Sequence, residues 1–208
     1  MRGHASGQGA RRIAAVLAVW LVFTGGAACG KSARPEKWAQ PVASAVLENW
    51  YQVDEGLYRS RQPDRKGFEE ARTKGIRTII NLRAEYSDAK LVKGLGFELV
   101  EIPLSASSFT QEEILSVLRA IEKSAKPVLM HCQHGSDRTG VVSAAYRILY
   151  QGWTKDEAIA ELKDGGFGFH RFYVNIPAFI RNLDVARTKA RLAPKSSKAA
   201  IRPAAAVR

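Results

Sequence analysis

The chain has 208 residues, of which 46% are hydrophobic and 25% charged, with 17 Gly, 8 Pro and 2 Cys. This globular composition excludes a fully disordered chain, a collagen-like repeat and a disulfide-rich scaffold, and the length indicates one domain with its own core. The net charge of +12 comes from the ends: residues 1–37 hold six Lys/Arg and one acid, residues 185–208 hold seven and none, and the middle has 19 of each. No nucleic-acid partner is expected for a core without a basic excess.

Residues 1–28 have the pattern of an export signal. Two arginines precede the apolar run Ile13–Phe23, and small residues lead to Cys29. The run has 11 residues, and a transmembrane helix needs roughly 20. The small residues resemble a bacterial lipobox, with Gly26 where Leu or Val is usual, so we expect lipidation of Cys29 and an exported lipoprotein anchored to a membrane. The alternative is plain cleavage after Ala28, which gives a periplasmic or secreted protein.

The rest of the chain divides into three parts. Residues 29–49 lack sustained periodicity and are expected to be a tether, residues 50–184 hold the predicted domain, and residues 185–208 are expected to be a basic disordered tail. Alternating strands and helices in the domain predict a single α/β fold, with a mostly parallel central sheet of about four to five strands flanked by helices. Strands are predicted at 56–60, 76–82, 97–104 and 127–131, and helices at 64–74, 83–95, 110–124, 139–151 and from 154 onward.

Local signals support several of these helices. Asp64 is a predicted N-cap, and Thr110 with Glu113 and Thr154 with Glu157 form predicted capping boxes. A last helix is predicted from apolar residues at helical spacing, which are expected to be core. These residues are Phe172, Ile176, Phe179, Ile180 and Leu183.

The segment 131–140, His-Cys-Gln-His-Gly-Ser-Asp-Arg-Thr-Gly, lies where a strand should give way to a helix. A Cys with an Arg six positions later arises by chance in about one such chain in six. The His before the Cys, the Gly at the third loop position and the Thr-Gly after the Arg lower this chance to about one in a million. The residues between strand and helix can curl so that backbone N–H groups bind an anion at the helix N-terminus, and Gly135 permits the tight turn. Arg138 offers a planar fork to two phosphate oxygens.

These residues predict phosphoryl transfer. The anion-binding loop also favours the thiolate of Cys132, a nucleophile that can take a phosphoryl group before water releases it. No cofactor and no metal are expected, because the loop dipoles and the guanidinium stabilise the charge. A metal cluster of His131, Cys132 and His134 is the weaker interpretation, since neighbours on an extended strand point to opposite faces.

The segment resembles the signature loop of the cysteine-dependent tyrosine and dual-specificity phosphatases, and the similarity extends over about residues 50–183. The chain is most similar to the bacterial dual-specificity-like subset. This resemblance implies a four-stranded parallel sheet and the hydrolysis of phosphate monoesters through a phosphocysteine intermediate. The other matching segments are Gly56–Ser60 with Gln62-Pro63, Ile80–Arg83 and Gly165–Gly168.

The resemblance also implies roles for single residues. Cys132 is the nucleophile and Arg138 clamps the phosphate. The Thr139 hydroxyl helps the thiolate to leave, and His131 braces the loop from behind. Arg83, at a strand end, is either a substrate contact or an exposed structural arginine. The phosphate loop consists of Gln133, His134, Gly135, Ser136, Asp137 and Arg138.

The chain departs from the family pattern in its general acid. Family members usually carry an Asp on the loop after the strand that precedes the signature, and residues 103–109 contain no acid. Asp137 resembles a residue in the signature loops of myotubularins and some bacterial lipid phosphatases, so we expect it to be the acid, with Glu112, Glu113 or water as alternatives. Those bacterial loops often have Lys where Ser136 stands, which weakens the case for a phosphoinositide substrate.

Three other functions stay open at this point. One is a phosphoinositide or other small-molecule phosphatase on the same fold. Another is a non-catalytic phosphate-binding pseudophosphatase, which the presence of both Cys132 and Arg138 disfavours. A sulfurtransferase of the rhodanese type is disfavoured by His131 and by Thr139-Gly140. The expected partners are a phosphorylated protein or small molecule and a membrane, and the expected state is a monomer.

Overall fold

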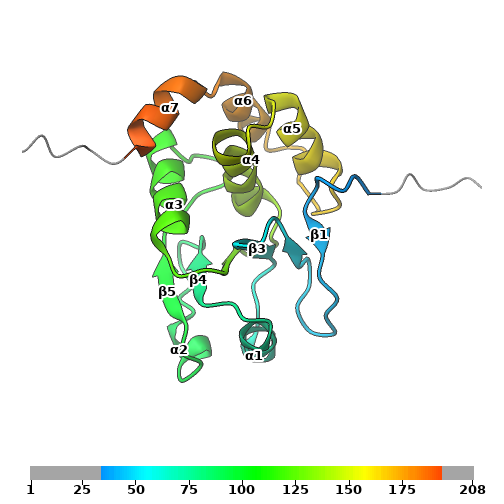
Figure 1. Cartoon of the computed structure of the whole chain (residues 1–208), viewed down its shortest axis with the longest axis vertical. Coiled ribbons are helices and arrows are strands. Elements are labelled where there is room, and N and C mark those ends of the chain that lie inside the picture. The colour runs from blue at the N-terminus through cyan, green and yellow to red at the C-terminus, as the bar shows by residue number, and fades with distance from the viewer. Residues whose placement is uncertain (1–33, 194–208) are drawn as a thin grey trace, which may run out of the picture. The chain divides into compact units, whose positions relative to one another are not determined.

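The computed structural model describes residues 34–193 (Figure 1). Within this range six strands form one sheet in the order β1-β2-β3-β6-β4-β5. Four adjacent strands, β3, β6, β4 and β5, are parallel, as predicted, and the two extra strands are antiparallel and only two residues long. The strands are β1 (Gln40–Pro41), β2 (Tyr51–Gln52), β3 (Leu57–Ser60), β4 (Thr78–Asn81), β5 (Glu98–Glu101) and β6 (Val128–His131).

Helices cover both faces of this sheet (Figure 1). One face carries α1 (Arg65–Thr73) and the short α2 (Ala89–Val92). On the opposite face lie α3 (Gln111–Lys123), α4 (Asp137–Gln151), α5 (Lys155–Asp164), α6 (Asn175–Asn182) and α7 (Val185–Leu192).

The burial pattern of the central strands follows from these two helical layers. Every residue of β3, β4 and β6 is buried, as expected for parallel strands covered on both faces. In β6, Val128 and Met130 pack with α3 and α4, whereas Leu129 packs against α1. Because the side chains alternate, His131 and Cys132 leave the end of this strand toward opposite faces.

Three predicted helix starts, those of α1, α3 and α5, are confirmed. Asp64 caps α1 through a hydrogen bond from the backbone N–H of Gly67, and both capping boxes form at α3 and α5. Helix α4 begins at Asp137, two residues before the predicted start, so the acid lies in its first turn. Local capping chemistry therefore predicts the residues at which α1, α3 and α5 begin.

The domain is larger than predicted at both ends. Residues 34–49 were expected to be part of a tether, but Ala39 and Leu47 are buried, and Arg34 donates a hydrogen bond of 2.8 Å to the carbonyl of Gly165. At the other end α7 is helical: Asp184 caps it, and Thr188 is 1% exposed. The predicted disordered tail is thus wrong for residues 185–192, because the cap and the packed face stabilise a helix there.

Two further expectations are corrected. The helix predicted over residues 83–95 is confined to α2, because the Asn81 side chain donates to the carbonyl of Tyr86 and holds the preceding segment as a loop. Phe172, assigned to the core, is 71% exposed and lies before α6, whereas Ile176 and Ile180 are fully buried. Helical spacing alone did not reveal where the helix begins.

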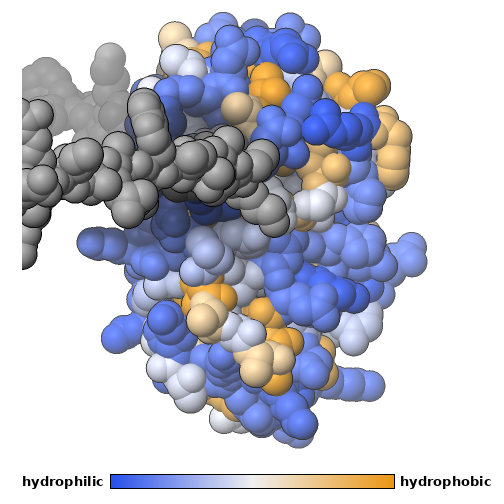
Figure 2. All heavy atoms as spheres, turned by 90° about the vertical axis from the view of Figure 1, so that its right-hand side faces the viewer, coloured by the Kyte–Doolittle hydropathy of each residue, from blue (hydrophilic) through white to orange (hydrophobic). Residues whose placement is uncertain are grey.

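The surface carries no sign of a membrane span within the described range. No helix among residues 34–193 is long and apolar enough to cross a membrane. The side that carries β1 and α5 is mostly hydrophilic, with small separate apolar patches (Figure 2). The predictions for residues 1–28, for Cys29 and for the end of the tail lie outside the described residues.

Candidate active site

The predicted phosphate loop lies at the carboxyl edge of the parallel strands. Cys132 follows β6 directly, is 2% exposed, and is separated by four residues from Asp137, the first residue of α4. This edge is where parallel sheets bind ligands, and the helix N-terminus behind the loop favours an anion. Arg138, the second residue of α4, is half-buried, and Gln133 and His134 are exposed.

Gly135 is the tightest point of the loop. Its φ is +73°, and a Cβ atom there would lie 2.6 Å from the carbonyl carbon and oxygen of Ser60. Both the left-handed backbone and the contact with β3 exclude a side chain. Opposite this contact, the Nη2 of Arg59 donates a hydrogen bond of 2.7 Å to the carbonyl oxygen of Gly135. The loop is therefore held from behind by two neighbouring residues of β3.

Arg59 places a positive charge behind the loop. It is 1% exposed, and its guanidinium lies 3.7 Å from the centroid of the Phe167 ring. Burial lowers the pKa of Arg59 to about 10, although the nearby Glu161 and Cys132 oppose this shift. Arg59 therefore stays charged at neutral pH and favours the thiolate of Cys132. Arg59 was not among the predicted site residues, although a charged residue inside a buried strand is a signal that could have identified it.

A second set of contacts ties the loop to the turn between α5 and α6. The Asn49 side chain donates to the carbonyls of His134 (2.7 Å) and Phe167 (2.9 Å), and the Ser136 hydroxyl donates to the same Phe167 carbonyl (2.6 Å). Residues 165–168, named in the sequence only as a segment of the family resemblance, thus also support the loop. Asn49 was missed because it fell in the expected tether.

His131 lies on the opposite side of the sheet from Cys132. It is fully buried, and its Nε2 is 2.8 Å from the Oδ2 of Asp88, whose Oδ1 accepts a hydrogen bond from Gln62. The ring also packs near Phe68, with 6.0 Å between centroids. This position agrees with a residue that braces the loop, and Asp88 is the partner that the sequence did not reveal.

Asp137 forms a close pair with His170. Its Oδ1 accepts the backbone N–H of His170 at 3.0 Å, and its Oδ2 lies 2.8 Å from the Nδ1 of the imidazole. The His134 ring lies beside that imidazole, with 5.4 Å between centroids. His170 was not among the residues predicted for the site. Its place on a loop far from Asp137 in sequence gave no signal of this contact.

A cavity of about 300 Å³ opens beside the loop and the Asp137–His170 pair. His170 lines this cavity, and Asp137 does not. The side chain of His170 is 39% exposed, against 8% for Asp137. The imidazole is therefore the part of the pair that faces solvent. The other lining residues are Glu48, Asn49, Arg61, His134, Ser136, Phe167 and Gly168.

The alternative acids are engaged elsewhere. A hydrogen bond from the Thr110 hydroxyl, together with one from its backbone N–H, lowers the pKa of Glu113 in the capping box. Glu112 bonds Arg119 and Arg191, and the hydrogen bond from Arg119 is the main cause that lowers the pKa of this carboxyl. Both carboxylates are thus stabilised in the ionised form, which makes them poor proton donors.

Two other predicted residues have distinct environments. The Thr139 hydroxyl is buried, and no group within residues 34–193 forms a hydrogen bond with it, so it can serve a group in the phosphate loop. The Arg83 guanidinium lies 4.1 Å from the centroid of the Tyr86 ring and donates to the Gln62 side chain at 3.1 Å. These contacts favour the structural role for Arg83.

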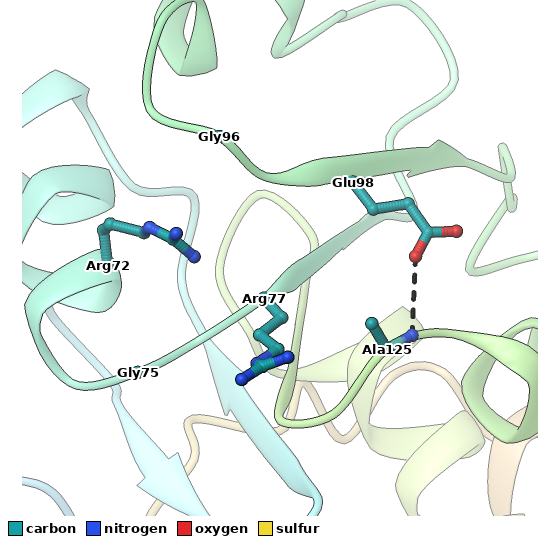
Figure 3. Close-up of a pocket in the computed structure, with 6 residues that line it drawn as sticks. All are labelled: Arg72, Gly75, Arg77, Gly96, Glu98 and Ala125. Atoms are coloured by element: carbon teal, nitrogen blue, oxygen red, sulfur yellow. Dashed lines mark hydrogen bonds between the residues drawn. The ribbon is translucent and has the colours of Figure 1, made fainter.

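A larger cavity, about 540 Å³, lies at the amino ends of the strands (Figure 3). Arg72 and Arg77 line it with Glu98, whose carboxylate accepts a hydrogen bond of 3.4 Å from the backbone N–H of Ala125. It lies at the edge of the sheet opposite the phosphate loop. The smaller cavity is lined by the loop residues His134 and Ser136, although not by Cys132, and is therefore the one that adjoins the candidate site.

Comparisons with known proteins identify the family of the chain. A family model described as "Polymorphic toxin system, DSP-PTPase phosphatase" matches residues 53–152. The dual specificity protein phosphatase TpbA of Pseudomonas aeruginosa is 35% identical over 178 residues, covering 83% of this chain and 79% of TpbA. A crystal structure of a Cys-to-Ser variant of TpbA with phosphotyrosine is similar with a TM-score of 0.70, at 31% identity, and covers 77% of this chain and 98% of that one. The catalytic core of the PP-IP phosphatase Siw14 from S. cerevisiae shares the fold, with a TM-score of 0.61, 23% identity, and coverage of 73% of this chain and 98% of that one.

Proposed function

Because the chain belongs to the bacterial dual-specificity-like subset of the cysteine-dependent tyrosine phosphatases, we propose that residues 131–139 carry its catalysis and that it acts on phosphotyrosine in proteins. The chain is a phosphatase that hydrolyses phosphate monoesters through a phosphocysteine intermediate. One observation carries the proposal for the site. The loop that begins at Cys132 leads directly into the first turn of α4, which contains Arg138, at the carboxyl edge of the sheet.

The proposed reaction has two steps. First, the Cys132 Sγ attacks the phosphorus, an S–P bond forms, and the bond to the leaving oxygen breaks. The loop N–H groups and Arg138 stabilise the phosphoryl oxygens. Water then attacks the phosphocysteine, the S–P bond breaks, and the Thr139 hydroxyl stabilises the departing thiolate. His131 positions the loop throughout.

The Asp137–His170 pair supplies the proton in this proposal. The leaving oxygen needs a proton in the first step, and the attacking water must lose one in the second. Asp137 holds the imidazole at Nδ1, which leaves the other ring nitrogen to face the cavity. In this proposal the pair takes the role of the acid that residues 103–109 lack. The exposed His170 faces the leaving group, and the buried Asp137 holds its ring in position.

Phosphotyrosine is favoured as substrate by the relative bound to it and by the aromatic rim of the site. Phe172 is 71% exposed, and its ring centroid lies 5.5 Å from that of His170. An exposed aromatic ring beside the cavity can pack against a phenyl group. A small-molecule phosphate is the second outcome that a substrate panel distinguishes.

The location of the enzyme is part of the proposal. The pattern of residues 1–28 and Cys29 supports export and a lipid anchor, and such an anchor holds a protein at a membrane surface. Such an enzyme meets substrates outside the cytoplasm. Export without lipid attachment is the alternative outcome.

The test measures phosphate release from three substrates: a phosphotyrosine peptide, the matched phosphoserine peptide and an inositol phosphate. We expect the tyrosine peptide to be preferred, vanadate to inhibit, and a chelator to leave the activity present. Cys132→Ser should abolish turnover and retain binding of the tyrosine peptide. Preference for the inositol phosphate would refute phosphotyrosine as the substrate and favour a small-molecule phosphate. Activity that needs an added metal would refute the mechanism.

A further inference from the structure

Three potential metal ligands meet beside the phosphate loop. His134 comes from the loop, Asp137 from the first turn of α4, and His170 from the segment between α5 and α6. One ligand atom from each residue lies within 4.8 Å of the other two. Asp137 and His170 are already 2.8 Å apart, and Asp137 is 6% exposed, so two of the three groups are held in place.

The chemistry of these donors selects a class of ion. Two imidazoles and one carboxylate suit Zn²⁺ and similar divalent transition ions, whereas Mg²⁺ and Ca²⁺ prefer sites made only of oxygen. Ligand atoms that surround a tetrahedral Zn²⁺ at about 2.1 Å lie about 3.4 Å apart. The side chain of His134 is exposed and can close the remaining distance by a small rotation.

The surroundings leave a fourth position for water or a phosphate oxygen. His134 and His170 line the cavity of about 300 Å³, so an ion between them is reached from solvent. One carboxylate residue lines the same cavity, Glu48, and its side chain pairs with Arg61. Glu48 does not belong to the group of three, which makes it a matched control for carboxylate charge at this cavity.

We propose that His134, Asp137 and His170 form a binding site for a divalent transition ion such as Zn²⁺, and that its occupation inhibits the phosphatase. The binding claim stands on the geometry alone. The inhibition rests on the proposed function, because the ion takes the electron pairs of Asp137 and His170 that the proton transfer needs. A metal-bound form is thus a reversible inactive state of the enzyme.

Binding is tested on the full-length chain with Cys132→Ser, which removes the catalytic thiolate as a competing ligand. Zn²⁺ is titrated in competition with a chromogenic chelator. In that background we add His170→Asn, which keeps a donor toward Asp137 but ligates zinc poorly, or His134→Ala, which changes an exposed side chain. Each should weaken binding at least about 10- to 100-fold, the loss typical even for outer-sphere partners. Glu48→Gln should bind Zn²⁺ within about twofold, and Mg²⁺ should not compete.

Zn²⁺ that binds elsewhere on the chain, for example at Cys29, binds equally to all these variants. It therefore does not affect the difference in Zn²⁺ affinity between them. Equal affinity with and without His170→Asn would overturn the site, and so would Zn²⁺ binding that needs Cys132. The inhibition is tested on the protein with Cys132 intact, where Zn²⁺ should inhibit at the concentration that fills the site, and a chelator should reverse it. If that protein has no phosphatase activity, the proposed function fails while the binding experiment still decides the site.

Discussion

Arg59 is the residue through which stability and nucleophile reactivity are most directly connected. It donates to the Gly135 carbonyl at 2.7 Å, lies 3.7 Å from the Phe167 ring centroid, and carries a buried charge near Cys132. Arg59→Met removes all three interactions and keeps an apolar side chain of similar length. Arg59→Lys is the matched variant, because it keeps the charge and loses the planar fork.

The expected effects can be estimated separately. A hydrogen bond from a charged donor contributes about 1.5–3 kcal/mol and a desolvated cation–π contact about 2 kcal/mol, while removal of a buried charge returns part of its desolvation cost. We expect Arg59→Met to lower the unfolding free energy by about 2–3 kcal/mol, and so Tm by about 5–10 °C. Loss of a charge interaction of about 1–2 kcal/mol with the thiolate should slow alkylation of Cys132 about 5- to 30-fold at any pH where most of the thiol is still protonated.

The assay follows alkylation by iodoacetamide over a pH series, and the variants are compared where the rate still rises with pH. The Cys132 peptide is quantified by mass spectrometry, and thermal unfolding of each variant is measured beside it. Arg59→Lys should lose stability and keep most of the alkylation rate. The reasoning is refuted if Arg59→Met alkylates at the wild-type rate while folded. It is equally refuted if Arg59→Lys and Arg59→Met are indistinguishable in both measurements.

The remaining predictions concern the proton donor, the loop and the anchor. Asp137→Asn should cost about 10²–10⁴ in turnover on tyrosyl phosphate and much less on an activated aryl phosphate, whose phenolate leaves unaided; equal losses would make Asp137 structural. Gly135→Ala should destabilise the fold by at least about 2 kcal/mol and abolish turnover, whereas Gly152→Ala, also at positive φ but with nothing within 4 Å, should cost about 1 kcal/mol and keep activity. Cys29→Ala should release the protein from bacterial membranes, and an unmodified Cys29 at the mature N-terminus by mass spectrometry would contradict lipidation.

The parts of the fold that the sequence predicted are those encoded by local chemistry. Capping residues such as Thr110 and Thr154 place helix starts because their partners are three residues away. The place of the phosphate loop was predictable as well, because the apolar strand 127–131 and Cys132 are adjacent in the sequence. The short strands β1 and β2 were missed, since two residues carry no periodic pattern.

The supports of the site could not be predicted, because they come from distant parts of the chain. Asn49 is 85 residues from His134, and His170 is 33 residues from Asp137, in loops whose composition allows many conformations. The turn at Phe167 supports the loop mainly through its backbone carbonyl, which every residue has. Only the buried Arg59 carried a usable signal, because a charge inside an apolar strand requires a partner.

The position of the proton donor has a consequence for how the enzyme works. An acid on residues 103–109 would lie on a separate loop, whose place relative to the phosphate depends on the conformation of that loop. Asp137 instead precedes Arg138 on α4, so one helix end positions both the phosphate clamp and the buried half of the donor pair. The other half, His170, is fixed to Asp137 by two contacts of 3.0 and 2.8 Å. In the proposed mechanism, proton transfer therefore needs no loop closure, and the proposed metal site uses the same fixed pair of side chains.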